Sequence, residues 1–172
     1  MKTVVVTLAL AGALVAQSAL AGLFVGRTVS VNLVLVAVVY VALLFGAVPG
    51  LLAGTIGGLA QDALGGGIIG IGGLAKTMIG FLVGVLAAQF NLSTSVPRLV
   101  MFVAATFVHE VVFGGLQAIT GGRHFALKFS VVLLQALING LIGWLAFVLV
   151  ENAPQAVANR RMRRATLSKR RF

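Results

Sequence analysis

The chain has 172 residues and carries 13 lysines and arginines against three acidic residues, which gives a net charge of +10. Sixty per cent of the residues are hydrophobic and only 9% are charged, whereas about 25% of the residues of a soluble domain are charged. This composition excludes a water-soluble globule and predicts a small polytopic membrane protein.

The chain has few chemically reactive side chains. The absence of cysteine excludes disulfides, zinc–thiolate sites and thiol nucleophiles. Two histidines and the three acidic residues Asp62, Glu110 and Glu151 are too few for most hydrolytic or metal-dependent sites. We therefore expect no catalytic residues, no metal and no cofactor, and the protein is predicted not to be an enzyme.

Six apolar segments are predicted to be helices, because a helix needs about 20 apolar residues to cross the bilayer core. The charge-free stretch from Val31 to Leu59 is too long for one helix. Pro49-Gly50 is expected to divide it, since proline removes a backbone donor and disfavours helix in the preceding residue. The expected bundle occupies residues 1–152, and its helices cover approximately residues 4–25, 32–48, 51–64, 68–90, 99–119 and 125–150. The predicted fold class is all-α, a polytopic membrane bundle of six helices, with five as the alternative.

The lysines and arginines set the orientation, because cytoplasmic segments of membrane proteins carry an excess of both. Residues 153–172 form a basic tail with seven of them. With six spans, Lys2, Arg98 and the tail place nine basic residues inside against three outside, and five spans give the same ratio. The tail is therefore predicted to be cytoplasmic. Lys2, the apolar stretch and Ala19-Leu20-Ala21 also resemble a signal peptide, whose removal would leave the remaining topology unchanged.

Small residues recur at helical spacing in the middle of the chain, where residues 46–84 hold 13 of the 22 glycines. Small residues on one face allow two membrane helices to approach closely. Two such sets are Gly50, Gly54 and Gly58 on the third predicted helix and Gly80 and Gly84 on the fourth. Packing between these two helices is the favoured interpretation, and a surface for another protein, with Gly54 and Gly58 as its contacts, is the alternative.

The first predicted helix has a similar strip of small residues, formed by Ala9, Gly12, Ala13 and Ala16. Because no helix precedes it in the chain, this strip is the better candidate for a surface that faces a partner.

Ionisable groups at membrane depth are costly unless they are paired or hydrated, and they often mark functional sites. The sequence has three of special interest, Asp62, Lys76 and Glu110. Structural roles are favoured: Asp62 caps or terminates the third helix, and Lys76 neutralises a carboxylate. His109 is expected to donate to a neighbouring helix. Because it is turned by about 100° from Glu110, the two are not expected to form one site that faces one cavity.

A ligand cavity is the alternative use of the intramembrane polar groups. Glu110 and Gln117 are expected to share a face of the fifth helix that points into the bundle, and Gln135 and Asn139 are four residues apart on the sixth. These four side chains are the candidates for lining such a cavity.

The basic tail is able to bind anionic lipid headgroups or an acidic protein surface, or it serves only to set the topology. Nucleic acid is an unfavourable partner, because the sequence shows neither aromatic residues among the basic ones nor a fold for groove recognition.

The stretch from Gly57 to Gly84 resembles the rod shape-determining protein MreD family. That family carries a Gly-Leu-x-x-Asp-x-Leu core, a glycine shortly after it, and a helix that ends in Gly-aromatic-Leu-x-Gly. The residues at these positions are Gly58, Leu59, Asp62, Leu64, Gly70, Gly80, Phe81 and Gly84. The size of the chain, its helix layout and its basic tail agree with the resemblance.

The resemblance implies a multi-pass protein of the bacterial inner membrane that belongs to the cell-elongation machinery. Such proteins bind MreC and, through it, the glycosyltransferase RodA with its transpeptidase, and they help to link both to MreB filaments. The family has no known reaction of its own. Its helical arrangement is similar to that of the substrate-binding subunits of energy-coupling-factor vitamin transporters.

The resulting hypothesis is a non-enzymatic scaffold that binds MreC and supports lateral peptidoglycan synthesis and rod shape. The helix 1 strip or the Gly54–Gly58 ridge is expected to meet the partner, while Asp62 and Lys76 shape the hairpin of helices 3 and 4. The alternative is a substrate-binding subunit of a vitamin-type transporter, in which Ala9 and Ala13 would dock the coupling subunit.

Overall fold

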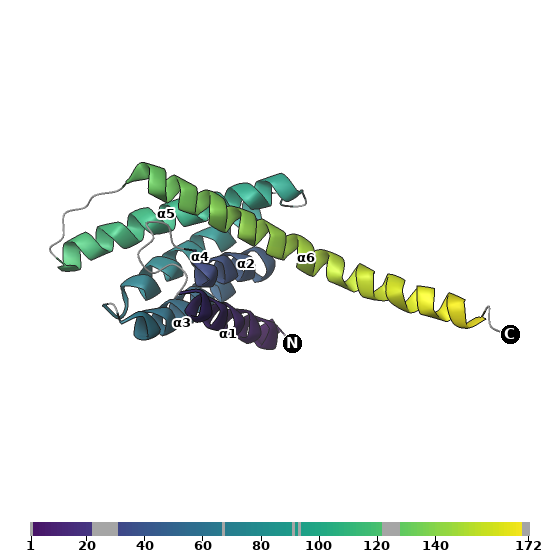
Figure 1. Cartoon of the computed structure of the whole chain (residues 1–172). Coiled ribbons are helices and arrows are strands. Elements are labelled where there is room, and N and C mark those ends of the chain that lie inside the picture. Colours follow the sequence, from purple (N-terminus) through teal and green to yellow (C-terminus); the bar gives the residue numbers. More distant parts are fainter. Residues whose placement is uncertain are drawn as a thin grey trace.

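The computed structural model describes residues 2–21, 31–66, 68–90, 92, 94–121 and 128–169. Within these residues the fold is all-helical, as predicted (Figure 1). Its six helices are α1 (Lys2–Ala21), α2 (Leu33–Phe45), α3 (Ala47–Gly65), α4 (Ile71–Gln89), α5 (Ser95–Gly121) and α6 (Phe129–Lys169).

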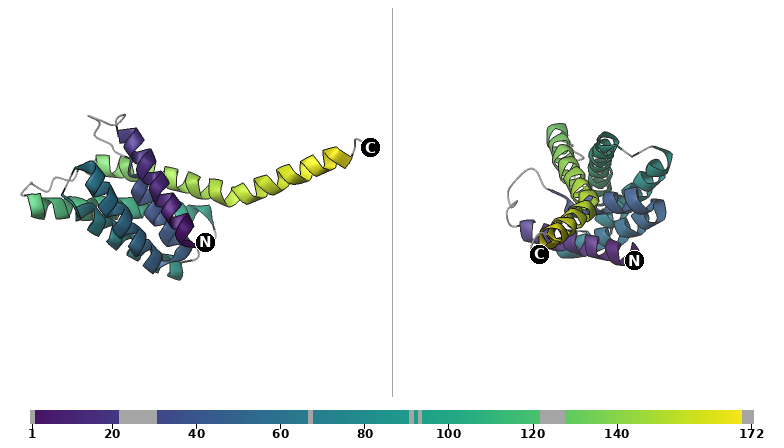
Figure 2. Two further views of the ribbon diagram at one scale, coloured as in Figure 1. Left: turned by 90° about the horizontal axis from the view of Figure 1, so that it is seen from below. Right: turned by 90° about the vertical axis from the view of Figure 1, so that its right-hand side faces the viewer.

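Helix α2 is the centre of the bundle and contacts each of the other five helices. Its sequence is apolar on every side, which is typical of a helix buried all round. Val34, Leu35 and Val38 have no exposed surface. By contrast, α1 lies on the outside of the bundle (Figure 2) and contacts only α2 and α3 among the described helices.

The break between α2 and α3 lies at Gly46, so the prediction that Pro49-Gly50 divides the two helices is wrong. Gly46 has a φ of +94°, in the region that favours glycine. Pro49 lies in the first turn of α3, where its missing N–H is not needed. The same reason applies to Pro97, which was expected in a loop but lies in the first turn of α5.

The turn between α3 and α4 is also displaced from its predicted position. Helix α3 continues to Gly65, and α4 begins at Ile71 rather than near residue 68. Gly66 and Gly70 both have positive φ, of +65° and +107°, and so end one helix and precede the next.

The two ends of the bundle differ from the expected bounds. Helix α1 begins at Lys2, and its predicted end at Val25 lies outside the described residues, as do residues 125–127 of the last predicted helix. Helix α6 is 41 residues long and continues to Lys169. The region expected as a separate tail therefore extends the helix to that residue (Figure 1).

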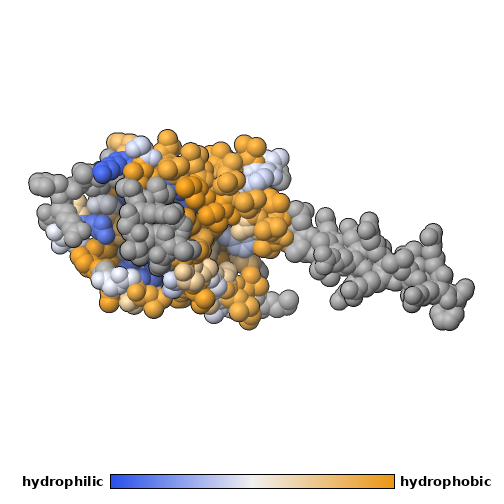
Figure 3. Space-filling model, viewed as in Figure 1, coloured by the Kyte–Doolittle hydropathy of each residue, from blue (hydrophilic) through white to orange (hydrophobic). Residues whose placement is uncertain are grey.

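Four of the described helices are long and apolar enough to cross a membrane: Thr3–Leu20, Ile71–Gln89, Ser95–Gly121 and Phe129–Val150. Leu33–Phe45 is a shorter apolar helix. The face seen in Figure 3 is mainly hydrophobic. On α6, exposed leucines recur every four residues at positions 133, 137, 141 and 145, which is the surface expected of a helix against lipid. The chain is therefore a multi-pass membrane protein.

Candidate functional site

The glycines of α3 bring this helix into backbone contact with α4. A methyl group added to Gly58 would lie 2.5 Å from the Cα atom of Gly73, and one added to Gly54 would overlap with the carbonyl oxygen of Lys76. Gly50 and Gly80 face each other in the same way. These residues form the closest helix pair of the bundle, as the favoured interpretation of the glycine spacing predicts.

This packing changes the role of Gly54 and Gly58. Both are buried, and α4 covers them, so the expectation that they contribute to a surface for another protein does not fit the geometry. Gly84 has the same internal role, because a methyl group there would overlap with the backbone of Ala47.

Asp62 caps α4 across the hairpin. Its Oδ2 atom accepts hydrogen bonds from the backbone N–H groups of Gly70, Gly72 and Gly73, at 2.9, 2.9 and 3.1 Å. These donors have no partner within the helix, and a negative charge at a helix N-terminus is favourable. Asp62 was expected to cap or terminate α3; it lies in the last turns of α3 but satisfies the start of α4.

Other residues of the Asp62 motif have separate roles. Leu59 packs against Gly73, where a methyl group would lie 3.0 Å from its side chain. Leu64 and Phe81 are exposed, with 69% and 47% of their surface accessible. Sequence reasoning missed a hydrogen bond of 2.8 Å between the hydroxyl groups of Thr55 and Thr77, which also joins α3 to α4.

A second group of polar residues lies between α4, α5 and α6. Glu110 Oε1 accepts a hydrogen bond of 2.8 Å from Gln135 Nε2 and lies 3.2 Å from His109 Nδ1. Lys76 of α4 is buried, with 2% of its surface exposed. The contact between His109 and Glu110 was not expected from their spacing, because the flexible Glu110 side chain reaches the neighbouring imidazole. That the two residues do not face one cavity stays a prediction.

The remaining cavity candidates lie apart from this group. Asn139 is buried, and its Oδ1 atom accepts a bond of 3.1 Å from the backbone N–H of Asn32, which precedes α2. Gln117 is exposed. Gln17 of α1 was not singled out from the sequence, yet its Oε1 atom accepts a hydrogen bond of 3.2 Å from the N–H of Val34.

The strip of small residues on α1 is accessible at Gly12 and half-covered elsewhere. Gly12 is exposed and no atom lies within 4 Å of the position that its Cβ would occupy, whereas Ala9, Ala13 and Ala16 are half-buried. The inner face of α1 is marked by Leu10, which is 5% exposed, and Ala13 of the strip packs against the same hydrophobic cluster. Only 6% of the span Thr3–Leu20 is buried in the bundle.

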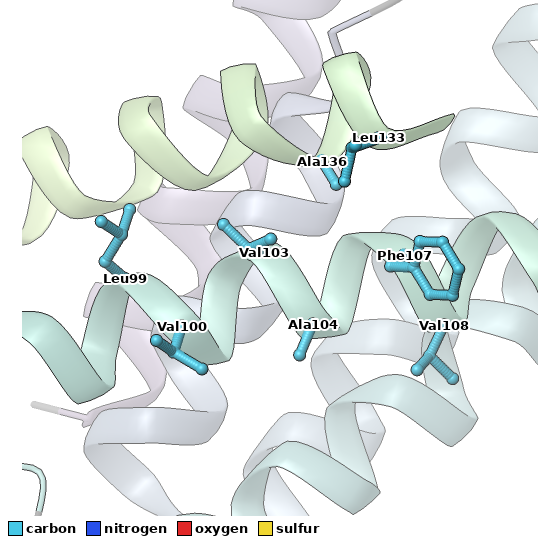
Figure 4. Close-up of a pocket in the computed structure, with 8 residues that line it drawn as sticks. All are labelled: Leu99, Val100, Val103, Ala104, Phe107, Val108, Leu133 and Ala136. Atoms are coloured by element: carbon cyan, nitrogen blue, oxygen red, sulfur yellow. The ribbon is translucent and has the colours of Figure 1, made fainter. Parts of the chain in front are cut away.

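Two apolar grooves open on the outside of the bundle. The first, of about 380 Å³, follows one face of α5 from Leu99 to Val108 and is bordered by Leu133 and Ala136 of α6 (Figure 4). The second, of about 290 Å³, lies between α1 and the start of α3 and is lined by residues that include Thr3 and Pro49. Neither groove is lined by the ionisable residues of the interior.

Helices with lipid-facing leucines and polar groups held between them define a polytopic α-helical membrane protein. The family model of the rod shape-determining protein MreD matches residues 1–157. The chain therefore belongs to the MreD family, as the motif around Asp62 predicts, and this family gives it a role in determining rod shape. No curated protein and no solved structure gave a significant match.

Proposed function

We propose that the protein is a non-enzymatic scaffold of the bacterial elongation machinery, which binds MreC in the inner membrane. Through MreC it supports lateral peptidoglycan synthesis by RodA and its transpeptidase and links them to MreB. Membership of the MreD family supports this role. The family consists of structural membrane proteins and is not known for enzymes.

The observation that carries the proposal is the exposed Gly12 in the small-residue strip on α1. Membrane helices associate where small residues let their backbones approach, because burying apolar groups against one another gains little in lipid. The glycines of α3 and α4 pack against each other inside the bundle and are not available to a partner. By contrast, no atom lies within 4 Å of the position that a Cβ atom of Gly12 would occupy. A partner helix is able to approach the backbone of α1 there.

The second interaction in the proposal involves the C-terminal part of α6. Seven basic residues follow residue 153, and each contributes about 1 kcal/mol of attraction near an anionic leaflet. This supports a cytoplasmic location for the tail and contact with the lipids of the inner membrane.

The test is co-purification of MreC with variants of α1. Gly12→Leu fills the open space on the strip, so we expect it to abolish co-purification while the protein still inserts and folds. The matched control is Ala11→Leu, because Ala11 is also exposed but lies about 100° further round the helix, away from the strip. Undiminished co-purification of the Gly12→Leu variant would reject the α1 strip as the binding surface.

A vitamin-binding transporter subunit has less support. Such a protein needs several polar side chains free to face a ligand, but Gln135 is bonded to Glu110 and Asn139 to Asn32. Gln117 is exposed rather than directed into the bundle with them.

A further inference from the structure

The groove between α5 and α6 is lined entirely by apolar side chains (Figure 4). Ala104 and Ala136 are the smallest of them, and their short side chains leave a hollow between the larger ones. Ala136 has no exposed surface and lies at the floor, whereas Val100 and Leu133 at the rim are 58% and 54% exposed. Because both helices have apolar segments long enough to cross a membrane, the groove opens toward the hydrocarbon of the bilayer.

The groove is as long as one leaflet of the membrane. Its lining on α5 runs from Leu99 to Val108, which is about 14 Å at the rise of an α-helix. The hydrocarbon core of a bilayer is about 30 Å thick, so each leaflet contributes about 15 Å. A transmembrane helix of a partner would need a track across both leaflets. The length of the groove therefore fits the acyl chain of a lipid better than a partner helix.

The groove begins at the end of the bundle where the C-terminal part of α6 leaves it. Leu99 directly follows Arg98, whose guanidinium carbon lies 4.2 Å from the ring centre of Phe147 on α6. This contact places the start of α5 beside the end of the apolar segment Phe129–Val150. The groove therefore opens to the leaflet on the side of the C-terminus.

The charge at this end of the bundle indicates the kind of lipid. The sequence from residue 151 to the C-terminus holds seven basic residues against one acidic residue, Glu151. Basic residues close to a bilayer attract anionic headgroups and raise their local concentration. A lipid chain in the groove also gains dispersion contacts with both walls, which a flat lipid-facing surface does not provide. An anionic lipid is therefore favoured at its headgroup by charge and along its chain by contact area.

We propose that the groove between α5 and α6 holds one acyl chain of an anionic phospholipid from the leaflet on the side of the C-terminus. The groove binds the chain, and the basic residues after residue 153 attract the headgroup. The site is separate from α1, which among the described helices contacts only α2 and α3. It therefore does not depend on the proposed binding of MreC.

The test is lipid retention by the full-length protein, reconstituted with equal amounts of phosphatidylglycerol and phosphatidylethanolamine that carry the same acyl chains. After extraction in a mild detergent, native mass spectrometry should show phosphatidylglycerol retained in preference to phosphatidylethanolamine. Ala104→Leu fills the groove at an exposed position. Losing roughly ten carbon–carbon contacts with the chain should lower the retention of phosphatidylglycerol on the order of tenfold.

The matched control is Ala11→Leu, which makes the same change at an exposed position of α1. This variant should retain phosphatidylglycerol as the wild type does. Undiminished retention in the Ala104→Leu variant would overturn the groove as the binding site. Equal retention of the two lipids by the wild type would overturn the choice of an anionic lipid.

A photo-crosslinker distinguishes a lipid from a partner helix in the groove. The chain has no cysteine, so Ala104→Cys provides a single position for a benzophenone label. After irradiation of native membranes, we expect the labelled protein to gain the mass of a phospholipid. A crosslink to another protein at this position would overturn the proposal.

Discussion

A single carboxylate oxygen holds the first turn of α4. Three backbone donors, from Gly70, Gly72 and Gly73, converge on Asp62 Oδ2, and a side chain at position 72 would overlap with that carboxylate. Glycine at position 72 and aspartate at position 62 therefore form one structural unit, which explains why the motif combines an acidic residue with closely spaced glycines.

Removing the Asp62 carboxylate should destabilise the hairpin. We expect Asp62→Ala to lower the free energy of unfolding by about 1–3 kcal/mol, because it leaves the donors at the start of α4 without an acceptor. Asp62→Asn keeps one oxygen in place and should cost less. Thermal unfolding of the purified variants in detergent measures both, and an Asp62→Ala variant as stable as the wild type would rule out this cap.

The sequence indicates which residues matter in the hairpin better than it indicates their partners. The intramembrane location of Asp62 and the spacing of the glycines were sufficient to predict a close pair of helices. The helix that Asp62 caps was not predictable, because the three N–H groups come into reach only after the chain has turned at Gly66 and Gly70, both with positive φ. The contact between Glu110 and His109 was missed because residue spacing on a helix does not describe a flexible side chain.

At the scale of the elements, helix existence was predictable and helix ends were not. Long apolar runs identify the spans, but proline was taken as a helix breaker at positions 49 and 97. In both places proline lies in the first turn of a helix. Backbone N–H groups in the first turn have no acceptor within the helix, so proline removes no hydrogen bond there. The actual break, at Gly46, depends on a positive φ that composition does not reveal.

Gly58 is packed against another helix and Gly12 is not, so replacing each by alanine should change the stability of the protein in opposite directions. Gly58→Ala should destabilise the protein by about 1–3 kcal/mol, because the added methyl group must push α3 away from Gly73. Gly12→Ala meets open space and should be neutral or stabilising by up to about 1 kcal/mol, since alanine is the better helix former. Chemical or thermal unfolding of both variants gives the comparison, and equal effects would show that the α3–α4 contact is looser than described.

For the whole molecule, one helix organises the bundle. Helix α2 is apolar on all sides and touches each of the other helices, so it fixes their arrangement, although it is shorter than a typical span. Its start is held by side chains from three places in the chain: Gln17, Asn32 and Asn139. Of these three amides, the sequence analysis singled out only Asn139, as a candidate for lining a cavity, because the amides meet at one helix end only in the assembled bundle.

The orientation of the whole bundle is the remaining prediction. Nine basic residues on the side of the C-terminus against three on the other side favour a cytoplasmic C-terminus. A fluorescent protein fused after Phe172 should therefore be fluorescent, and alkaline phosphatase at the same position should be inactive, because it needs the disulfides that form outside the cytoplasm. The matched fusion after Gly121, between α5 and α6, should show the reverse, since Phe129–Val150 is long enough to cross the membrane. Active phosphatase at the C-terminus would show that the bundle has the opposite orientation. The basic residues would then lie at the outer leaflet, where the proposed contacts with inner-leaflet lipids are not possible.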